Sequence, residues 1–443
     1  MQHLYQVLPH ITTNILTKKA VHNQKSNRQH SGLYKRIRIT LQPHKGGHMN
    51  DFNFFSPTEI VFGKKREHES GSLIKRHGGS KVLIVYGKGS AVKSGLIDRV
   101  KLSLEQAGIP YFFLGGVEPN PKDDLIYKGI DICKAEGVDF LYAVGGGSAI
   151  DSAKAIAIGA CYDGDFWDFY GTGKPVEKAL PVGVILTIAA AGSEASGSSV
   201  VTKKEGLLKR DVSSNLIKPK FAILNPQLTC TLPAYQTACG ATDIMAHILE
   251  RYISNTSDVQ TSDRICEGLL LSMVEEVPKV IANPEDYQAR ANIMWAGTLA
   301  HNGIAGEGRA QDWNSHRIEH ELSGLYDCAH GAGLAVVMPA WMKHVYKRNV
   351  PLFVQFATRV FGCTEDKEHP NKTAEEGIAC FRKFLTSIGM PETMEELGGR
   401  EEDIPLLVEK LGLNHGKTGG FVALSEADVT EILISTLEKN VRK

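Results

Sequence analysis

The stretch Phe140-Leu-Tyr-Ala-Val-Gly-Gly-Gly-Ser-Ala-Ile-Asp-Ser-Ala-Lys154 decides the fold. Its apolar start is typical of a buried strand, glycines follow at once, and helical periodicity begins behind them. The same order of apolar run, glycine and helical pattern recurs from Met49 to about Thr229. Repeated strand-turn-helix units favour a mainly parallel sheet that is covered by helices on both faces.

The two halves of the chain carry different patterns. Strands are predicted at Val82–Tyr86, Tyr111–Leu114, Phe140–Val144, Val182–Thr187 and Phe221–Leu224. After Asn225-Pro226 and Leu232-Pro233 the strand signal fades, and helices are predicted at Gln260–Ile281, Ala289–Ala300, Pro370–Ile388 and Ser425–Lys439. Because 443 residues exceed a typical single core, we expect an α/β domain over residues 49–228 and an all-α domain over residues 229–443.

The composition is that of a globular protein. Apolar residues make up 42% of the chain, and no apolar run approaches the length of a membrane span. The eight cysteines are scattered without a C-x-x-C pair, which argues against zinc-ribbon or dithiol chemistry and favours a reducing, cytoplasmic location. Beyond residue 48 the chain holds 42 basic against 50 acidic side chains, which gives no support to a nucleic-acid partner.

Residues 1–48 form a basic leader with eight Lys or Arg and no Asp or Glu. Such a segment fits a transit peptide. The string Lys45-Gly-Gly-His-Met49 can also be encoded by a purine-rich ribosome-binding sequence just ahead of an ATG codon. We therefore expect Met49 to be the physiological start and residues 1–48 to lie outside the functional protein; a cloning remnant is the alternative.

Three histidines and one aspartate are candidate metal ligands. Asp243 and His247 lie on a predicted helix with three residues between them, so they share one face, a turn apart. His316 lies on a second predicted helix, and His330 follows in a segment that we expect to be a loop. Spacing alone leaves solvated or packed roles open, because Asp-x-x-x-His is common on amphipathic helices.

These residues also carry a family resemblance. The strings Gly240-x-x-Asp243-x-x-x-His247, His316-x-x-x-His320 and His330-Gly331 resemble the metal region of the iron-dependent alcohol dehydrogenase superfamily, in its butanol dehydrogenase and NADPH-dependent aldehyde reductase branch. The resemblance runs from about Met49 to near the C-terminus. It implies an α/β N-terminal Rossmann-like dinucleotide-binding domain, an all-α C-terminal metal-binding domain, a homodimer, and Asp243, His247, His316 and His330 as the ligands of one divalent metal.

The resemblance further implies which residues bind the nicotinamide cofactor. A glycine turn at a helix start offers free amides to a diphosphate, and Lys154 lies close to that turn in sequence. The expected cofactor-binding residues are Gly87, Lys88, Gly89, Ser90, Asn120, Gly145, Gly146, Gly147, Ser148, Asp151, Thr187 and Lys209. The chain departs from the family at 189–191, where three alanines replace a small polar run, and at Asn225, which replaces an Asp and is expected to cap or turn the chain.

The choice between NAD and NADP depends on the turn Gly87-Lys-Gly-Ser90. Family members that prefer NAD often carry an Asp here, which binds the ribose 2′-hydroxyl and repels a 2′-phosphate. This turn holds no acid, and Lys88 would attract the phosphate. We therefore expect NADP(H), with NAD(H) as the alternative and Lys88 as a solvated lysine in that case.

The expected metal is Fe²⁺, with Zn²⁺ as the alternative, because nitrogen ligands with one carboxylate suit both ions. Such an ion polarises an alcohol or aldehyde oxygen. His320 lies one turn beyond His316, and the resemblance makes it the candidate for substrate contact or proton relay; a histidine that is satisfied by its helix neighbours is the alternative. Asp151, Glu319 and Glu321 are expected to be poorer bases, since charged residues on helices usually face solvent. Trp313 and Trp341 are candidates for a substrate wall or, more simply, for core packing.

The favoured function is reversible oxidation of a small primary alcohol such as butanol, or reduction of the aldehyde, with nicotinamide. A lyase similar to dehydroquinate synthase is an alternative that needs a basic pocket, and the sequence shows no Lys/Arg cluster beside the metal motifs. A metallohydrolase without nicotinamide is the third possibility. Beyond the alcohol or aldehyde, no nucleic-acid or membrane partner is expected.

Overall fold

The computed structural model describes residues 48–441. The basic leader predicted from the sequence lies outside these residues apart from His48. Among the described residues, no helix is both long and apolar enough to cross a membrane.

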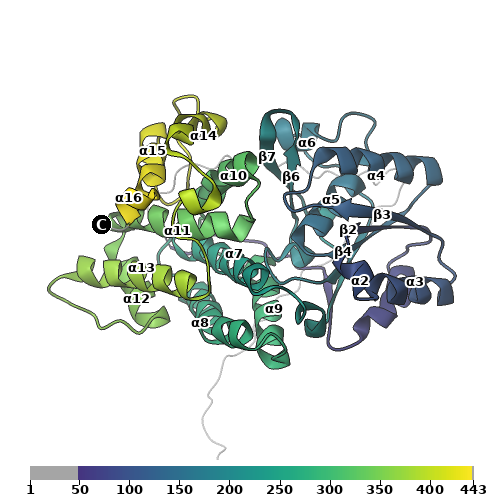
Figure 1. Ribbon diagram of the computed structural model, residues 1–443, viewed down its shortest axis with the longest axis horizontal. Helices are drawn as coiled ribbons and strands as arrows, with labels where there is room; N and C mark the ends of the chain where they lie inside the picture. The colour runs from purple at the N-terminus through teal and green to yellow at the C-terminus, as the bar shows by residue number, and fades with distance from the viewer. Residues whose placement is uncertain (1–47, 442–443) are drawn as a thin grey trace, which may run out of the picture. The chain divides into compact units, whose positions relative to one another are not determined.

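The first half of the described chain is built on a six-stranded parallel sheet (Figure 1). The strand order is β1-β8-β5-β4-β2-β3. Its strands are β1 (Glu59–Phe62), β2 (Val82–Gly87), β3 (Tyr111–Val117), β4 (Phe140–Gly145), β5 (Val182–Leu186) and β8 (Phe221–Leu224). The five strands predicted from the sequence are confirmed, while β1 was missed because its four residues at the sheet edge give too short a pattern.

Side chains alternate between the two faces of this sheet. On one face, Leu83 and Leu141 pack against helices α4 (Asp123–Glu136) and α5 (Gly147–Gly159). On the other face, Ile84 and Val144 pack against α1 (Ser70–Arg76) and α3 (Leu96–Gln106). Both faces are therefore dry, which explains why the strands read as continuous apolar runs.

The strand order reverses beside β2, which has β3 on one side and β4 on the other. In open α/β sheets, ligands bind at such a switch point, beyond the carboxyl ends of the strands. The turn after β2 leads to α2 (Ser90–Lys93), and the turn after β4 leads to α5. The two predicted glycine turns thus lie at the switch point.

A second sheet is an antiparallel hairpin of β6 (Ser198–Lys203) and β7 (Leu208–Ser213), which the sequence analysis missed. The hairpin lies between the sheet and the helical half, beside α10 (Figure 1). It carries Lys209 across to that half. The short helix α6 (Asp168–Gly171) packs on β7.

The second half of the described chain is helical. Its helices are α7 (Ala234–Tyr252), α8 (Gln260–Ala282), α9 (Tyr287–His301), α10 (Asn314–Tyr326), α11 (His330–Val345), α12 (Val350–Val360), α13 (Pro370–Ser387), α14 (Ile404–Lys410), α15 (Glu426–Ser435) and α16 (Glu438–Val441). The four predicted helices exist, but the predicted window 425–439 is divided between α15 and α16. The 3-10 helices are η1 (Arg66–Glu69), η2 (Ser193–Ala195), η3 (Glu205–Leu207), η4 (Asn215–Ile217), η5 (Pro226–Thr229), η6 (Tyr346–Arg348), η7 (Glu395–Leu397) and η8 (Glu401–Asp403). As expected, Asn225 caps η5, its side-chain oxygen accepting from the Gln227 amide at 3.1 Å.

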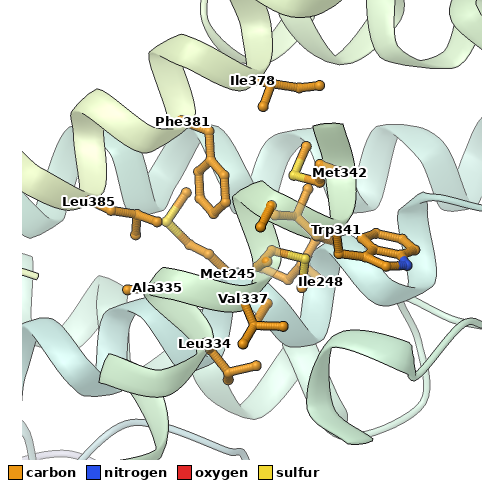
Figure 2. Close-up of a cluster of buried hydrophobic side chains, with 14 of the residues drawn as sticks. Met245, Ile248, Leu334, Ala335, Val337, Trp341, Met342, Ile378, Phe381 and Leu385 are labelled. Atoms are coloured by element: carbon orange, nitrogen blue, oxygen red, sulfur yellow. The ribbon is translucent and has the colours of Figure 1, made fainter. Parts of the chain in front are cut away.

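The core of the helical half lies where α7, α11 and α13 meet (Figure 2). Met245 from α7, Trp341 from α11 and Phe381 from α13 are each fully buried there. Trp341 therefore belongs to the core, which confirms core packing over a substrate wall as its role. A close approach fixes α7 against α11, because a Cβ on Gly331 would lie 2.0 Å from the Cys239 carbonyl oxygen.

Replacing Leu385 by alanine tests this core. The side chain is 2% exposed in the α13 contact, so its loss should cost about 2–5 kcal/mol of unfolding free energy. The matched control is Leu406→Ala on α14, where the side chain is 44% exposed and the expected loss is below about 1 kcal/mol. Denaturant unfolding monitored by circular dichroism measures both, and equal losses would contradict the assignment of this core.

Candidate metal centre and the adjoining cavity

Three helices bring the predicted ligands together. Helix α7 carries Asp243 and His247, α10 carries His316, and α11 begins with His330. The expectation that His330 lies on a loop is wrong: the glycines that suggested a loop allow close helix packing instead, as at Gly331.

The ligand atoms surround one carboxylate oxygen. Asp243 Oδ1 lies 3.4 Å from His247 Nε2, 3.7 Å from His316 Nε2 and 3.6 Å from His330 Nε2. The ligand atoms of Asp243, His316 and His330 all lie within 4.8 Å of one another. Asp243 Oδ1 and His316 Nε2 are buried without a hydrogen-bond partner. Orphaned buried acceptors of this kind need a partner, and a divalent cation between them would satisfy both.

Two buried glutamates orient the histidines from behind. His316 Nδ1 contacts Glu250, and His330 Nδ1 contacts Glu319. A carboxylate that accepts the Nδ1 proton leaves the Nε2 lone pair free to face a metal. Both glutamates are fully buried, so the expectation that Glu319 faces solvent is wrong, and Glu321 is also only 2% exposed.

Glu250 was missed as a functional residue. It lies seven residues after Asp243, which is two turns along the same face of α7. That spacing was the available signal. Glu319 lies one turn after His316, where its charge is balanced by Lys209 at 3.4 Å and by His330.

Two of the imidazoles at this site, His247 and His320, are held neutral, which suits metal binding and proton transfer. Burial lowers the pKa of His247 well below its usual value, so the ring is neutral at physiological pH. Burial, followed by the positive charge of Lys209, likewise lowers the pKa of His320. Neutral imidazole is the form that ligates metals and accepts protons.

A cavity of about 1090 Å³ joins the ligands to the sheet. All the predicted cofactor-binding residues line it, together with the four candidate ligands and His320. The amino end of α5 faces this cavity at Gly147, where the nearest neighbour of an added Cβ would be 3.9 Å away. Free amides at that helix end suit an anionic group.

Several predicted cofactor contacts are already engaged within the protein. The Asn120 amide donates to Asp327 and to the Cys328 carbonyl at 3.2 Å, and its oxygen accepts from Lys209 at 3.1 Å. Lys209 also donates to Ser323 at 2.7 Å. These two residues therefore join the sheet half to the helices that carry the candidate ligands.

Asp151 and Lys154 hold the segment that follows β5. The Asp151 carboxylate accepts from the Ser193 hydroxyl at 2.6 Å and from the Val200 amide at 3.1 Å. Lys154 is fully buried, does not line the cavity, and donates to the carbonyl oxygens of Ser193, Ser196 and Ser198. The Asp151 and Lys154 side chains therefore fix the backbone of residues 193–200.

An acid lies beside the turn at Gly87. Lys88 is paired with Glu118, which comes from the end of β3 and lines the same cavity. The turn itself holds no acid, as the sequence shows, but the cavity around it does. Glu118 was missed because the fold, not the sequence, places it there.

The helical side of the cavity holds further side chains that were not predicted. The Nδ1–H of His301 donates to the Ala191 carbonyl oxygen at 2.6 Å, and the ring of His301 lies 4.2 Å from that of His247. Trp313 lines the cavity between these rings and Arg251. Burial lowers the pKa of Arg251 to about 10. The sequence shows no Lys/Arg cluster beside the metal motifs, but the fold brings two arginines, Arg251 and Arg317, to the wall of the cavity.

Two family profiles match the chain. The profile described as iron-containing alcohol dehydrogenase matches residues 57–226, and the profile described as Fe-containing alcohol dehydrogenase family, C-terminal, matches residues 237–437.

Individual relatives agree with these profiles. A protein named probable NADH-dependent butanol dehydrogenase 1 from Bacillus subtilis is 41% identical over 88% of this chain and 100% of its own length. The NADPH-dependent aldehyde reductase YqhD from Escherichia coli is 37% identical over 84% of this chain and 95% of its own. The crystal structure of NADH-dependent butanol dehydrogenase A from Thermotoga maritima superposes with a TM-score of 0.85, at 41% identity, covering 88% of this chain and all of the other.

Replacing Glu250 by glutamine tests the orientation of His316. Glu250 accepts from both the His316 amide at 3.1 Å and His316 Nδ1. A Gln side chain has only one acceptor oxygen, so one of the two donors loses its partner or the imidazole changes tautomer. We expect the affinity for Fe²⁺ or Zn²⁺ to fall about 10- to 100-fold, measured by competition with a chromogenic chelator.

The control for this experiment is Glu375→Gln, which removes a half-exposed carboxylate that pairs with Lys343 on α11. Its metal affinity should equal that of the unsubstituted protein. An unchanged affinity in Glu250→Gln would show that this carboxylate does not orient a ligand.

Proposed function

Because the chain belongs to the iron-containing alcohol dehydrogenase family, we propose that it interconverts small primary alcohols and their aldehydes, such as butanol and butyraldehyde, with a nicotinamide cofactor. The chain is an alcohol dehydrogenase or aldehyde reductase. The observation that carries the proposal is the convergence of three imidazoles on Asp243 Oδ1, in the cavity that also contains both glycine turns. The relatives described above are dehydrogenases and a reductase, so they favour neither the lyase nor the hydrolase alternative.

The metal would be held by four side chains from the helical half, residues 229–443. These are Asp243, His247, His316 and His330. Fe²⁺ is the proposed ion and Zn²⁺ the alternative, since nitrogen ligands with one carboxylate suit both. When bound, the ion polarises the oxygen of the substrate, while the nicotinamide exchanges hydride with the substrate carbon.

The cofactor would be bound by the sheet half, residues 49–228. The amides at the start of α5 face the cavity and would hold the diphosphate through Gly145, Gly146, Gly147 and Ser148. Thr187 and Ala190 line the same cavity as the candidate ligands. The bound nicotinamide would thereby face the metal across the cleft.

We propose NADP(H) as the preferred cofactor and NAD(H) as the alternative. Lys88, Gly89 and Ser90 offer a cation and a hydroxyl to a 2′-phosphate. Glu118 opposes this preference, because it pairs with Lys88 in the absence of the phosphate. Binding NADP(H) must therefore draw Lys88 away from a surface ion pair, which costs about 1 kcal/mol or less.

His320 would contact the substrate and relay its proton. Its ring lies 5.7 Å from that of His330 and 6.3 Å from that of His316, and it lines the cavity. Because burial keeps this imidazole neutral, it can accept a proton from an alcohol.

The protein is proposed to act in the cytoplasm as a homodimer. All eight cysteines, which lie within the described residues, are free thiols, and this suits a reducing compartment. Three phenylalanines near the start of the described chain are about half exposed: Phe52 at 51%, Phe54 at 48% and Phe55 at 52%. Adjacent exposed aromatic side chains of this kind are typical of an interface.

The decisive experiment measures oxidation of NADPH and of NADH with butyraldehyde, using iron-loaded, chelator-treated and zinc-loaded protein. We expect turnover that disappears with the chelator and returns with Fe²⁺, and a higher kcat/KM for NADPH than for NADH. No turnover with either cofactor under any metal would overturn the proposed function. A higher kcat/KM for NADH would overturn only the cofactor preference.

The dimer is tested by light scattering on the eluted protein. We expect twice the chain mass, and about half that value for a variant in which Phe52, Phe54 and Phe55 are replaced by serine. The matched control replaces Phe113, an exposed phenylalanine on β3, by serine and should leave the mass unchanged. A monomeric mass for the unsubstituted protein would contradict the proposal.

A further inference from the structure

Arg251 is a buried cation on the wall of the cavity. It lies on α7 one turn beyond His247 and is 4% exposed. Its guanidinium carbon lies 4.6 Å from the centre of the Trp313 ring. Within residues 48–441 it forms one hydrogen bond, which Nη1 donates to the His247 carbonyl oxygen at 2.6 Å.

This guanidinium makes no ion pair with any carboxylate of the described residues, and its Nε is buried without a hydrogen-bond partner. Its sequence neighbour Glu250 is engaged by His316. Glu307 is close enough to interact electrostatically, but it forms no ion pair with Arg251. A buried charge without a partner is costly, so such groups normally have one.

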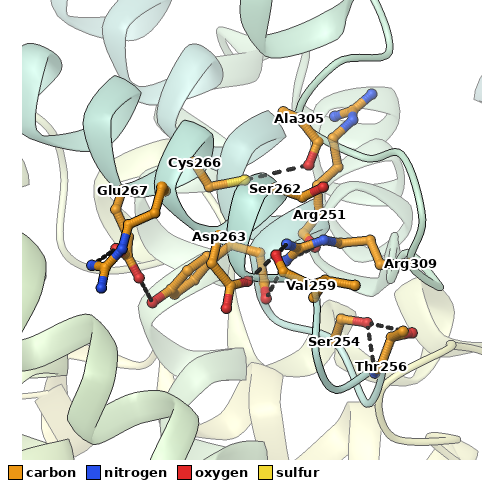
Figure 3. A network of polar contacts seen from close by, with 12 residues as sticks. Arg251, Ser254, Thr256, Val259, Ser262, Asp263, Cys266, Glu267, Ala305 and Arg309 are labelled. Carbon is orange, nitrogen blue, oxygen red and sulfur yellow. Dashed lines mark hydrogen bonds and ion pairs between the residues drawn. The ribbon is translucent and has the colours of Figure 1, made fainter. Parts of the chain in front are cut away.

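A second buried arginine nearby shows what the ordinary solution is. Arg309 donates to Asp263 at 2.7 Å and to the carbonyl oxygens of Arg251 and Tyr252 at 3.2 Å. Figure 3 shows Arg309 directed toward Asp263, while the Arg251 guanidinium points away from that network. The fold thus neutralises one of the two arginines and leaves the other facing the cavity.

The carboxylates of the cavity wall do not pair with the Arg251 guanidinium. Its carboxylates are Glu118, Asp151, Asp211 and Asp243. Glu118 pairs with Lys88, Asp151 holds backbone and hydroxyl groups, and Asp243 is a candidate ligand. The exposed Arg317, next to His316, also lines the cavity, and it contacts Thr418 without an ion pair among the described residues. Of the described residues that line the cavity, those on the helical side therefore include two cations, Arg251 and Arg317, and no free carboxylate.

We propose that Arg251 binds the carboxylate of the substrate, so that the preferred aldehydes are short oxo acids and the preferred alcohols the matching hydroxy acids. This inference rests on the proposed function and names its substrate class. In the reductive direction the aldehyde carbon receives hydride from the reduced nicotinamide. The carbonyl oxygen then gains one proton, which His320 relays from solvent, and the carboxylate is unchanged.

The position of Arg251 also sets the length of such a substrate. Residues one helical turn apart have Cβ atoms roughly 5–6 Å from each other, so the carboxylate site lies one turn from the His247 imidazole. This nearness of Arg251 to a candidate ligand on one helix suits a short substrate. Trp313 covers the path between the two sites with an aromatic face, which suits methylene groups.

The test compares two aldehydes of equal chain length, succinic semialdehyde and butyraldehyde, with the metal-loaded protein. We expect kcat/KM to be at least about 10-fold higher for succinic semialdehyde, because a charge-assisted hydrogen bond is worth that much. In Arg251→Gln the ratio of the two values should fall about 10- to 100-fold, mainly through KM for the oxo acid. Arg251→Lys should retain part of the preference, which separates lost charge from lost folding.

Arg400→Gln is the control, since this arginine is exposed on the far helices and pairs with Asp403. It should leave the ratio unchanged. A second measurement, calorimetric binding to the metal-loaded protein, does not depend on turnover. The unsubstituted protein should bind 4-hydroxybutyrate at least as tightly as 1-butanol. The Arg251→Gln variant should bind 4-hydroxybutyrate more weakly than the unsubstituted protein does.

The outcomes separate the two proposals. No turnover with either aldehyde would defeat the proposed function. Turnover of butyraldehyde with a ratio near one, or a ratio that Arg251→Gln does not change, would overturn this inference and leave the proposed function standing. A preference for glyceraldehyde 3-phosphate over succinic semialdehyde that Arg251→Gln abolishes would replace the carboxylate by a phosphate and so overturn the substrate class.

Discussion

The candidate metal centre depends on one constraint: a carboxylate oxygen and several imidazole nitrogens are held close together in a buried site. Glu250 and Glu319 take the Nδ1 protons of His316 and His330, so the opposite ring nitrogens face Asp243 Oδ1 as acceptors. Hydrogen-bond acceptors that face one another repel, whereas a cation bound between them is attracted to each of them. The packing of α7, α11 and α13 supplies the opposing force, because it fixes the helices regardless of what the ligands favour.

Much of this could be predicted from the sequence. Each of the five predicted strands is fully or partly buried and parallel, and periodicity therefore revealed them. The motifs around Asp243, His316 and His330 carried enough family likeness to identify the candidate site. The prediction that His330 lies on a loop was wrong because glycine, here Gly331, occurs both in loops and at close helix contacts. Only the short distance from Gly331 to the Cys239 backbone distinguishes the two cases.

What could not be predicted depends on contacts between distant segments. Glu118 reaches the turn at Lys88 only because β3 lies beside β2. Glu319 is buried with its charge balanced by His330 and by Lys209, which lies 110 positions earlier and crosses from the hairpin. Arg251 and Arg309 are both buried arginines of the same half, and nothing in the sequence indicates that Asp263 neutralises one of them and not the other. Charge compensation is a property of the folded chain.

The hairpin of β6 and β7 ties the two halves together along one edge. Lys209 meets Glu319 in a buried pair, Arg210 meets Glu321 at 2.8 Å, and Lys410 donates to the Gly206 and Leu207 carbonyls. Separating the halves along this edge would leave buried charges without partners, at a cost of several kcal/mol. The hairpin therefore acts as a charged clasp that makes the sheet half and the helical half cohere along this edge of the cavity.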